Sequence, residues 1–346
     1  MTALLLALPL LAALSAAVVR GLIARPLLLD LPDPRKAHAR PTPTGGGLGV
    51  IAAVAGGMAV LWAAGDPGPE RHAALLAAAA AMAAVGLLDD RLDLPALPRL
   101  FVQGAAAGVA MWGGLVIERV SLPWAGEVPL GVLGPVLTFV WFIGCTNAVN
   151  FLDGSDGLLG SGLLVTSVML ALLGITLGAP FVVALSLCLA AGFAGFLPFN
   201  WPAARIFLGD VGSQAAGFLL AGLGVAAALA TEARMSFAIV ALLLAAVLFD
   251  AGFTVARRAL AGEAFWRPHR AHLYQMAIRA GWPARRVALL HGGFAFAHGL
   301  LALLFLALPA EAKPLPLLAA LAGQVVWLGV VLRGMRRAGI GFATPP

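Results

Sequence analysis

The sequence predicts an all-α polytopic membrane protein with about eleven transmembrane helices. Hydrophobic residues make up 61% of its 346 residues, and charged residues only 11%. The mean hydropathy is +0.97, and the apolar residues occur in stretches of about 20. Because about a quarter of the residues in a soluble globular domain are charged, the composition excludes a soluble enzyme, a disordered chain and a fibrous protein.

Eleven apolar stretches are each long enough to cross a hydrocarbon layer about 30 Å thick. The segments between them are short, so we expect one integral membrane domain over residues 1–346. The first stretch could be read as a signal peptide, but no basic residue precedes it and its first charge, Arg20, comes at its end. We therefore expect a retained helix. The stretches cover approximately residues 3–23, 46–64, 73–89, 100–117, 132–150, 158–178, 181–199, 212–230, 236–256, 287–308 and 315–333.

The distribution of Lys and Arg predicts the orientation in the membrane. If the N-terminus lies outside, 18 of the 22 Lys and Arg residues fall on the inner side, and only Arg71, Arg119, Arg234 and Lys313 lie outside. The predicted topology is N-terminus outside and C-terminus cytosolic. Since topology explains most of the basic excess, we expect no nucleic-acid partner.

Acidic residues gather at the predicted cytosolic ends of several spans, and the longest inner loop adds His and Arg residues. Charges near membrane depth are costly and are usually kept for function. This pattern predicts an active site on the cytosolic face. The loops that would form it cover about residues 25–45, 89–99, 150–158, 199–212 and 257–286.

The fifth stretch ends in the run Asn147-Ala-Val-Asn150-Phe-Leu-Asp153-Gly-Ser-Asp156-Gly157. A spacing of three keeps Asn147, Asn150 and Asp153 within one sector of a helix. Their amide and carboxylate oxygens suit Mg²⁺ with its water shell, or a polar sugar. A helix end capped by polar residues is the alternative, but four such groups are more than capping needs.

Asp89 and Asp90 end the third stretch as adjacent carboxylates. Because they repel each other, a nearby cation or a raised pKa on one of them is expected, although a solvated helix end would look the same. Together with Asp153 and Asp210 they offer the incomplete oxygen cage that Mg²⁺ shares with substrate phosphates. We therefore expect Mg²⁺ as cofactor, with Mn²⁺ as a substitute.

The segment from Asn200 to Ser213 contains Gly209, Asp210 and Gly212 before an apolar helix. Free N–H groups at such a helix start can bind phosphate. Taken alone, a turn with Asp210 or Ser213 as the N-cap is the simpler interpretation.

Two further segments carry cations and histidines. The first inner loop contains Lys36, His38 and a glycine run, and topology explains its charge but not the histidine or the glycines. His269 and His272 are three residues apart, which is too little for a metal site without more ligands. Contact with a phosphate or uracil is favoured for this pair.

In combination, these motifs resemble the polyprenyl-phosphate N-acetylhexosamine-1-phosphate transferases, the glycosyltransferase 4 family that includes WecA-like and MraY-like enzymes. They occur in the family's order across residues 30 to 281, and the two Asn/Asp motifs are highly specific. Eleven spans resemble the WecA-like branch. The matches are Asp33-Pro-Arg-Lys36-Ala-His38 with Pro41-Thr-Pro, Leu88-Asp-Asp90 with Arg99 and Gln103, Asn147 to Gly157, Asn200 to Ser213, and Arg270-Ala-His272-Leu.

The resemblance implies transfer of an N-acetylhexosamine 1-phosphate from a UDP-sugar to undecaprenyl phosphate, with release of UMP, at the cytosolic face of the bacterial inner membrane. Membrane lipid would surround the chain, and the sequence leaves a homodimer open. Asp210 would hold Mg²⁺ with Asp153 close to it, and Asp89 or Asp90 would orient or deprotonate the lipid phosphate. The implied catalytic residues are Asp89, Asp90, Asp153 and Asp156, and the implied substrate-binding residues are Lys36, His38, Asn147, Asn150, Asn200, Phe207, Gly209, Arg270 and His272, with Phe207 near the uracil.

One departure from the family pattern affects the donor sugar. Many members have a further His pair where this chain reads His272-Leu-Tyr274-Gln275, and His269 stands where an Asp is common. This variant resembles the branch that initiates O-antigen-type polysaccharides, with UDP-GlcNAc or a related 6-deoxy-N-acetylhexosamine as donor. The consecutive histidines of the phospho-N-acetylmuramoyl-pentapeptide transferases do not occur, which disfavours peptidoglycan precursor synthesis.

Two alternatives come from other functional classes. A cation-coupled transporter predicts carboxylates near the midplane of several spans, whereas only Asp250 lies clearly inside one. A lipid-phosphate phosphatase would release inorganic phosphate and would need no UDP-sugar.

Overall fold

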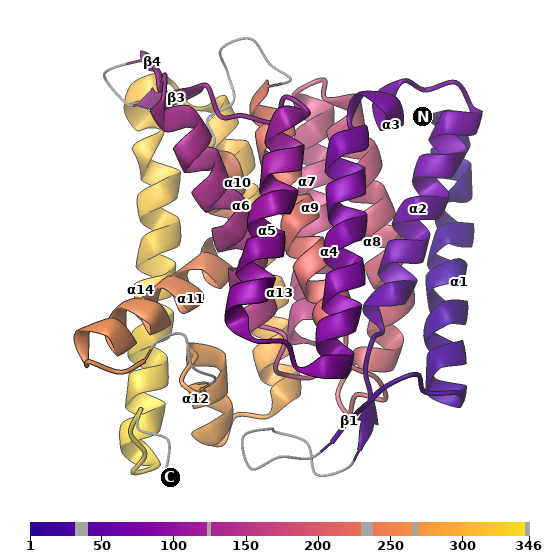
Figure 1. The fold of residues 1–346 in the computed structure, drawn as a ribbon. Coiled ribbons are helices and arrows are strands. Elements are labelled where there is room, and N and C mark those ends of the chain that lie inside the picture. Colours follow the sequence, from indigo (N-terminus) through magenta and orange to yellow (C-terminus); the bar gives the residue numbers. More distant parts are fainter. Residues whose placement is uncertain (32–40, 123–125, 230–237, 265–268, 343–346) are drawn as a thin grey trace.

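The computed structural model describes residues 1–346 except 32–40, 123–125, 230–237, 265–268 and 343–346. In the described part, long helices stand side by side in one bundle (Figure 1). The strands form two short antiparallel pairs, β1 (Leu29–Asp30) with β2 (Thr42–Pro43) and β3 (Arg119–Leu122) with β4 (Gly126–Pro129). The predicted all-α class is confirmed.

The helices follow most of the predicted apolar stretches. Among the described residues, eight helical segments are long and apolar enough to span a membrane, so the chain is a multi-pass membrane protein. The count of eleven and the orientation remain predictions. The helices are α1 (Thr2–Ala24), α2 (Gly47–Ala63), α3 (Gly68–Arg71), α4 (Ala73–Leu92), α5 (Ala96–Trp112), α6 (Leu133–Phe151), α7 (Leu158–Thr176), α8 (Pro180–Asn200), α9 (Asp210–Leu229), α10 (Ala238–Leu243), α11 (Ala245–Leu260), α12 (Leu273–Arg279), α13 (Ala284–Ala307), the 3₁₀ turn η1 (Ala310–Ala312) and α14 (Pro314–Arg337).

The expectation of one continuous span over residues 236–256 is wrong. The chain forms α10 and α11 instead, separated at Leu244, and α11 runs obliquely to the bundle (Figure 1). The physical reason lies in α11, where Asp250, Thr254 and Arg258 recur every fourth residue and are all buried. A helix with a polar stripe on one face must pack that face against protein, so lipid cannot surround it on all sides.

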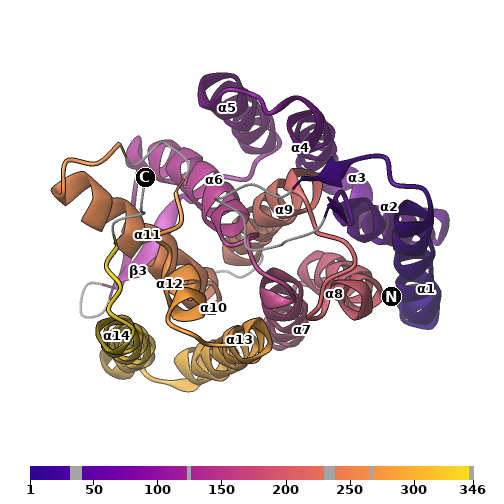
Figure 2. The ribbon, with the colours of Figure 1, turned by 90° about the horizontal axis from the view of Figure 1, so that it is seen from below.

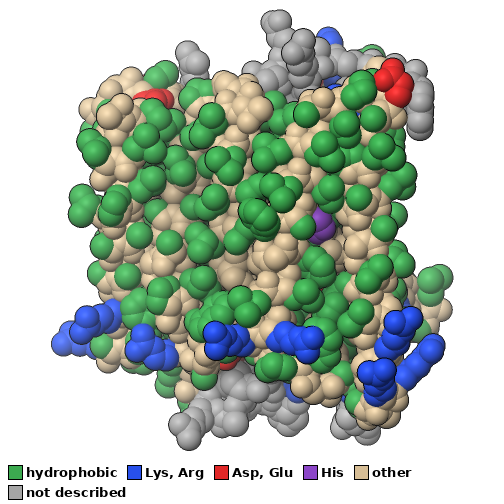
Figure 3. All heavy atoms as spheres, turned by 180° about the vertical axis from the view of Figure 1, so that it is seen from behind, with side chains coloured by type: hydrophobic (Ala, Val, Ile, Leu, Met, Phe, Trp, Pro, Cys, Tyr) green, Lys and Arg blue, Asp and Glu red, His purple; other side chains and the backbone are tan. Residues whose placement is uncertain are grey.

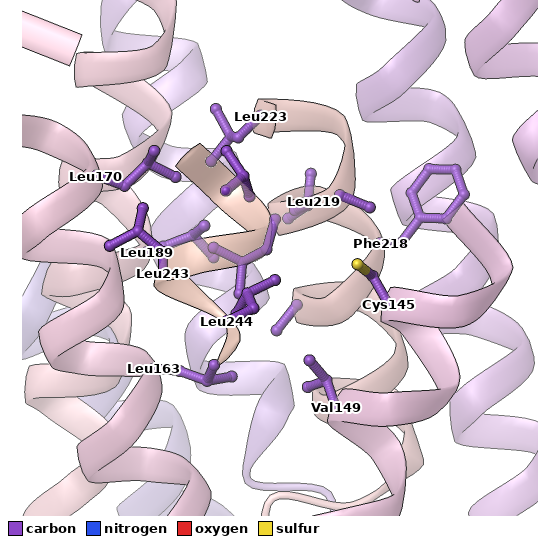
Figure 4. Close-up of a cluster of buried hydrophobic side chains, with 14 of the residues drawn as sticks. Cys145, Val149, Leu163, Leu170, Leu189, Phe218, Leu219, Leu223, Leu243 and Leu244 are labelled. Atoms are coloured by element: carbon purple, nitrogen blue, oxygen red, sulfur yellow. The ribbon is translucent and has the colours of Figure 1, made fainter. Parts of the chain in front are cut away.

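Helix α9 is the centre of the bundle. Almost all of its side chains are buried, and α4, α6 and α8 surround it when the bundle is viewed along its axis (Figure 2). Leu219 and Leu223 of α9 pack with leucines of α7, α8 and α10, and Phe218 packs towards α6 (Figure 4). The rings of Phe218 and Phe142 lie 4.7 Å apart. This apolar packing fixes the position of α9 and therefore of its first residue, Asp210.

Helices α4 and α9 approach closely at Gly86. A Cβ atom there would lie 2.6 Å from the backbone nitrogen of Val211 and would collide with the backbone of Asp210. Asp90 follows one helical turn later on the same face of α4. The glycine therefore brings the start of α9 within reach of the Asp90 carboxylate.

The outer surface fits a membrane protein. Hydrophobic side chains cover the middle of the bundle, and Lys and Arg gather along one edge (Figure 3). This one-sided basic edge agrees with the charge pattern behind the predicted topology. Inside the bundle, Cys145 and Cys188 are buried free thiols.

Candidate active site

Four helices bring polar side chains together at one end of the bundle. Helix α4 contributes Asp89 and Asp90 at its last turn, and α9 begins at Asp210, which sequence analysis placed in a loop. Residues one turn apart share a helix face, so α5, α6 and α9 each present a pair of groups to the place where the two adjacent acids of α4 lie. The other pairs are Arg99 and Gln103 on α5, Asn147 and Asn150 on α6, and Asp210 and Gln214 on α9.

Asp90 caps the N-terminus of α9. Its Oδ1 accepts a hydrogen bond from the Asp210 N–H at 2.9 Å, and its Oδ2 accepts one from the Val211 N–H at 3.2 Å. The first N–H groups of a helix lack partners within it and carry partial positive charge, so a carboxylate stabilises them. A residue 120 positions away in sequence therefore fills the N-cap role that sequence analysis gave to Asp210 or Ser213.

Gly209 makes this arrangement sterically possible. Its φ is +77°, and a Cβ atom would lie 2.6 Å from Asp90 Oδ2 and 2.8 Å from Thr44 Oγ1. Beside it, the Gly46 and Gly47 N–H groups donate to the Phe207 and Leu208 carbonyls at 2.9 and 2.8 Å. The glycine run of the first inner loop therefore pairs with the segment that leads into α9.

Asp89 forms an ion pair with Arg99. The Arg99 Nη1 lies 2.8 Å from Asp89 Oδ2 and 3.7 Å from Asp210 Oδ2, and the Leu94 N–H donates to Asp89 Oδ1 at 2.8 Å. The Asp89 side chain is 3% exposed and that of Arg99 is 33% exposed. Arg99 thus bridges two carboxylates and keeps access to solvent.

Asp210 is surrounded by amide donors. Asn150 Nδ2 donates to Asp210 Oδ1 at 2.8 Å and to Ser213 Oγ at 2.9 Å, and Gln214 Nε2 donates to Asp210 Oδ2 at 3.1 Å. Gln214 Nε2 also lies 3.5 Å from Asp89 Oδ2. The amide groups therefore hold the Asp89 and Asp210 carboxyl groups close together.

A chain of amides extends from the buried Gln214 and Gln103 to the half-buried Asn147. Gln103 Nε2 donates to Gln214 Oε1 at 3.4 Å, and Asn147 Nδ2 donates to Gln103 Oε1 at 2.6 Å. Sequence analysis missed Gln214. An (i, i+4) search from Asp210 along the following helix could have found it.

Asp153 lies in the turn after α6 and is half-buried. Burial, and the nearby Asp90 and Asp30 carboxylates, raise the pKa of Asp153 to about 8, against a backbone hydrogen bond from Gly209 that lowers it. At neutral pH this carboxyl group is therefore mostly protonated when no cation is present. Binding of a cation would displace the proton and favour the carboxylate.

Asp156 and Asn200 bind the backbone of the loop between α8 and α9. Asp156 Oδ2 accepts a hydrogen bond from the Ala204 N–H at 2.9 Å. Asn200 Oδ1 accepts one from the Gly157 N–H, and its Nδ2 donates to the Ile206 carbonyl, both at 3.0 Å. These bonds give both residues a role in positioning the loop, while their predicted contacts with substrate remain predictions.

His272 directly precedes α12 and is buried. Its Nδ1 lies 3.0 Å from Asp250 Oδ1, a partner that sequence analysis recognised only as a carboxylate inside an apolar stretch. His269 is nearby, with its ring 4.9 Å from that of His272. Burial, together with His272, Arg258 and Arg257, lowers the pKa of His269 to about 4, so His269 is neutral at pH 7.

Of the remaining predicted site residues, the structure describes two and leaves two outside the described residues. Phe207 and Arg270 are half-buried, and the Phe207 N–H donates to the Pro43 carbonyl at 2.9 Å. Lys36 and His38 lie outside the described residues. Their contacts with phosphate therefore stay predictions.

The donor set fits Mg²⁺. Within the described residues, no three His, Cys, Asp or Glu side chains converge as a complete set of metal ligands. Mg²⁺ usually takes one or two carboxylates and completes its shell with water and substrate phosphates. Asp210 and Asp153, oxygen donors at one end of the bundle beside further carboxylates, match that requirement.

Known proteins resemble this chain over most of its length. The glycosyl transferase family 4 model matches residues 72–228. A decaprenyl-phosphate N-acetylglucosaminephosphotransferase of Mycobacterium tuberculosis is 32% identical over 301 residues, 79% of this chain and 74% of the relative. The Mycobacterium leprae protein of the same name is 33% identical over 294 residues, 75% and 72% of the two chains. A probable undecaprenyl-phosphate N-acetylglucosaminyl 1-phosphate transferase of Bacillus subtilis is 29% identical over 262 residues, 75% and 72%.

Proposed function

Because the chain belongs to glycosyl transferase family 4, we propose that it transfers an N-acetylhexosamine 1-phosphate from a UDP-sugar to undecaprenyl phosphate. In this reaction an oxygen of the lipid phosphate attacks the phosphorus next to the sugar. The bond from that phosphorus to the UMP oxygen breaks, and UMP leaves. The products are undecaprenyl-diphosphate-sugar and UMP.

The observation that carries this proposal is the cluster of Asp89, Asp90, Asp153 and Asp210 at one end of a membrane bundle. A lipid acceptor requires a site at the membrane surface, because its phosphate is polar and its chain is apolar. Two phosphorylated anions can meet only where cations neutralise them. Carboxylates that hold Mg²⁺, with the Arg99 guanidinium beside them, would provide this neutralisation.

Asp210 and Asp153 would hold Mg²⁺, which when bound neutralises and polarises the phosphates. Asp89 or Asp90 would orient or deprotonate the lipid phosphate. Both oxygens of Asp90 accept bonds from the α9 backbone, and both oxygens of Asp89 also accept bonds, Oδ1 from the Leu94 N–H and Oδ2 from Arg99, whose side chain is partly exposed. Because the second pKa of a phosphate monoester is near 6, a strong base is unnecessary.

The substrate-binding residues would lie on both sides of this centre. Asn147, Asn150 and Gly209 would line the nucleotide-sugar site, with Phe207 near the uracil. Arg270 and His272, with Lys36 and His38 from the first inner loop, would contact phosphates. The relatives named above support an N-acetylglucosamine donor, and UDP-GlcNAc or a 6-deoxy relative is the donor we propose.

The proposed setting is the cytosolic face of the bacterial inner membrane, where UDP-sugars are made. There the product would initiate O-antigen or another cell-envelope polysaccharide. The distribution of Lys and Arg supports this orientation.

A product assay tests the proposal. Purified protein is incubated with undecaprenyl phosphate, Mg²⁺ and a panel of UDP-sugars, and the lipid product is identified by mass. We expect a diphosphate-linked N-acetylhexosamine and an equal amount of UMP, both abolished by EDTA and restored by Mg²⁺. Asp210→Asn should lower the rate by about a hundredfold or more. Asp66→Asn, the same change just before α3 at the opposite end of the bundle (Figure 1), is the matched control.

Other outcomes would contradict the proposal. An unchanged rate in Asp210→Asn would overturn the metal role, and release of inorganic phosphate without a UDP-sugar would indicate a phosphatase. Substrate flux into proteoliposomes without a lipid product would indicate a transporter.

A further inference from the structure

Asp250 carries a charge in one of the most buried environments of the described chain. The residue is 1% exposed, and it lies on α11 between apolar neighbours. An ionised carboxylate at such a position is costly unless hydrogen bonds and charge compensate it. Its partners therefore indicate why a carboxylate is present there.

Four donors converge on this carboxylate. Oδ1 accepts from the Leu273 N–H at 2.9 Å, from His272 Nδ1 at 3.0 Å and from Thr254 Oγ1 at 3.3 Å. Oδ2 accepts from the Tyr274 N–H at 3.2 Å. Three of the four donors belong to the consecutive residues 272–274, so Asp250 fixes the backbone and the imidazole of this segment together.

Capping of α12 alone does not require a buried charge. A neutral Ser, Thr or Asn accepts hydrogen bonds from the first N–H groups of a helix as well, and Gln275 Oε1 already accepts the His272 N–H at 3.2 Å. A carboxylate differs from these groups in its effect on a histidine. It binds Nδ1–H, fixes the tautomer and the ring orientation, and makes the other ring nitrogen more basic.

The segment that Asp250 holds lies against the turn that carries Asp153. The Tyr274 hydroxyl donates to the Phe151 carbonyl at 3.3 Å, and a Cβ atom on Gly154 would collide with that hydroxyl. The rings of Phe151 and His272 are 5.8 Å apart. His272 therefore packs beside the turn that carries Asp153, and Nε2 is the ring nitrogen that Asp250 does not bind.

We propose that Asp250 is a positioning residue of the transferase: it holds His272 by Nδ1 so that Nε2 contacts a phosphate of the substrates. This inference rests on the proposed function, because it assigns a partner to a residue of that active site. Asp250 itself does not touch substrate. Both residues lie outside residues 72–228, the segment that the family model matches.

A double-mutant cycle in the full-length protein tests this role. His272→Asn keeps an N–H donor near the position of Nδ1 but removes Nε2, and Asp250→Asn keeps an acceptor for the α12 backbone but removes the charge. We expect Asp250→Asn to lower kcat/KM by about tenfold to a hundredfold in the unchanged background. In the His272→Asn background it should lower kcat/KM by less than about twofold, because no Nε2 remains to be positioned.

Controls separate this role from a loss of folding. Thermal unfolding of each variant reports stability, and Asp66→Asn is the matched substitution. Asp66 Oδ1 also accepts a backbone N–H, from Gly68 at 2.8 Å, but it lies just before α3 at the opposite end of the bundle (Figure 1). Asp66→Asn should leave kcat/KM unchanged.

The outcomes are distinct. Equal losses from Asp250→Asn in both backgrounds, in step with a lower unfolding temperature, would show a purely structural role and overturn the inference. Unchanged kcat/KM in Asp250→Asn would also overturn it. If the unaltered protein forms no lipid-linked product from any UDP-sugar, the proposed function fails instead.

Discussion

At the scale of single residues, the adjacent Asp89 and Asp90 have different surroundings. Asp90 accepts two backbone hydrogen bonds from the start of α9, whereas Asp89 accepts one from the Leu94 N–H and pairs with Arg99, whose side chain is 33% exposed. A carboxylate that satisfies a helix terminus cannot leave it without cost. Asp90 therefore has a structural role at the start of α9.

Gly209 offers a residue-scale prediction. Gly209→Ala should lower stability by about 1–2 kcal/mol through its positive φ, and activity should fall further because the methyl group collides with Asp90 Oδ2. Gly65→Ala is the control, since Gly65 has a φ of +72° but open space around it. Thermal unfolding and UMP release measure the two effects. Equal losses of activity in both variants would contradict the collision.

Gln214 offers a second prediction. Gln214→Leu should remove one hydrogen bond from Asp210 and one from Gln103, lower stability by about 1–3 kcal/mol, and lower kcat by about tenfold or more through misplacement of Asp210. Gln324→Leu changes another buried glutamine, on α14, whose Nε2 lies 3.4 Å from His298. It should lower stability but not kcat. A similar kcat for both variants would show that Gln214 has no role in the active site.

At the scale of elements, the active end of the bundle depends on how closely α4 and α9 pack. Gly86 and Asp90 share one face of α4. Gly86 lets α9 approach this face, and the Asp90 carboxylate on the same face caps the start of α9. In helix α11, polar residues rather than glycines determine the packing. Its polar stripe of Asp250, Thr254 and Arg258 is buried against protein, and the helix runs obliquely to the bundle (Figure 1).

The α4–α9 contact predicts opposite effects for two glycine substitutions. Gly86→Ala should destabilise the protein by about 1–3 kcal/mol, because its methyl group would collide with the α9 backbone. Gly108→Ala, on α5 with open space around the position, should stabilise by up to about 1 kcal/mol through helix propensity. Unfolding temperatures measure the difference. A stable Gly86→Ala variant would contradict the close approach.

At the scale of the whole molecule, charge and apolar surface are arranged for a membrane. Lys and Arg occupy one edge of the bundle, beyond a broad apolar band (Figure 3). The acids of the candidate site are few, and Asp89, Asp90 and Asp210 lie at helix ends.

The orientation can be tested by labelling single introduced cysteines. Ala64→Cys, at an exposed position after α2, should react with a membrane-impermeant maleimide in intact cells. Asp93→Cys, exposed after α4, should react only in inverted vesicles. The native Cys145 and Cys188 are buried and should give little background. The reverse labelling pattern would invert the topology and move the candidate site to the outer face.

Much of the fold and of the site could be predicted from the sequence, because these features depend on residues that are close together in the chain. Hydropathy over about 20 residues is sufficient to identify a span, and the long helices fall where it placed them. Spacing along a helix brings Asn147 and Asn150 onto one face. The prediction failed at residues 236–256, because the polar stripe of α11 needs a protein partner that hydropathy does not show.

By itself, then, the sequence determined the membrane class, the positions of most helices, and the acids and amides that gather at one end, because each follows from neighbours within a few turns. Only the tertiary structure decided what those groups do. Asp90 meets the start of α9 across 120 residues, Gln103 meets Gln214 across 111, and Asp250 meets His272 across 22. Packing around α9 sets these partnerships, and no local spacing encodes them.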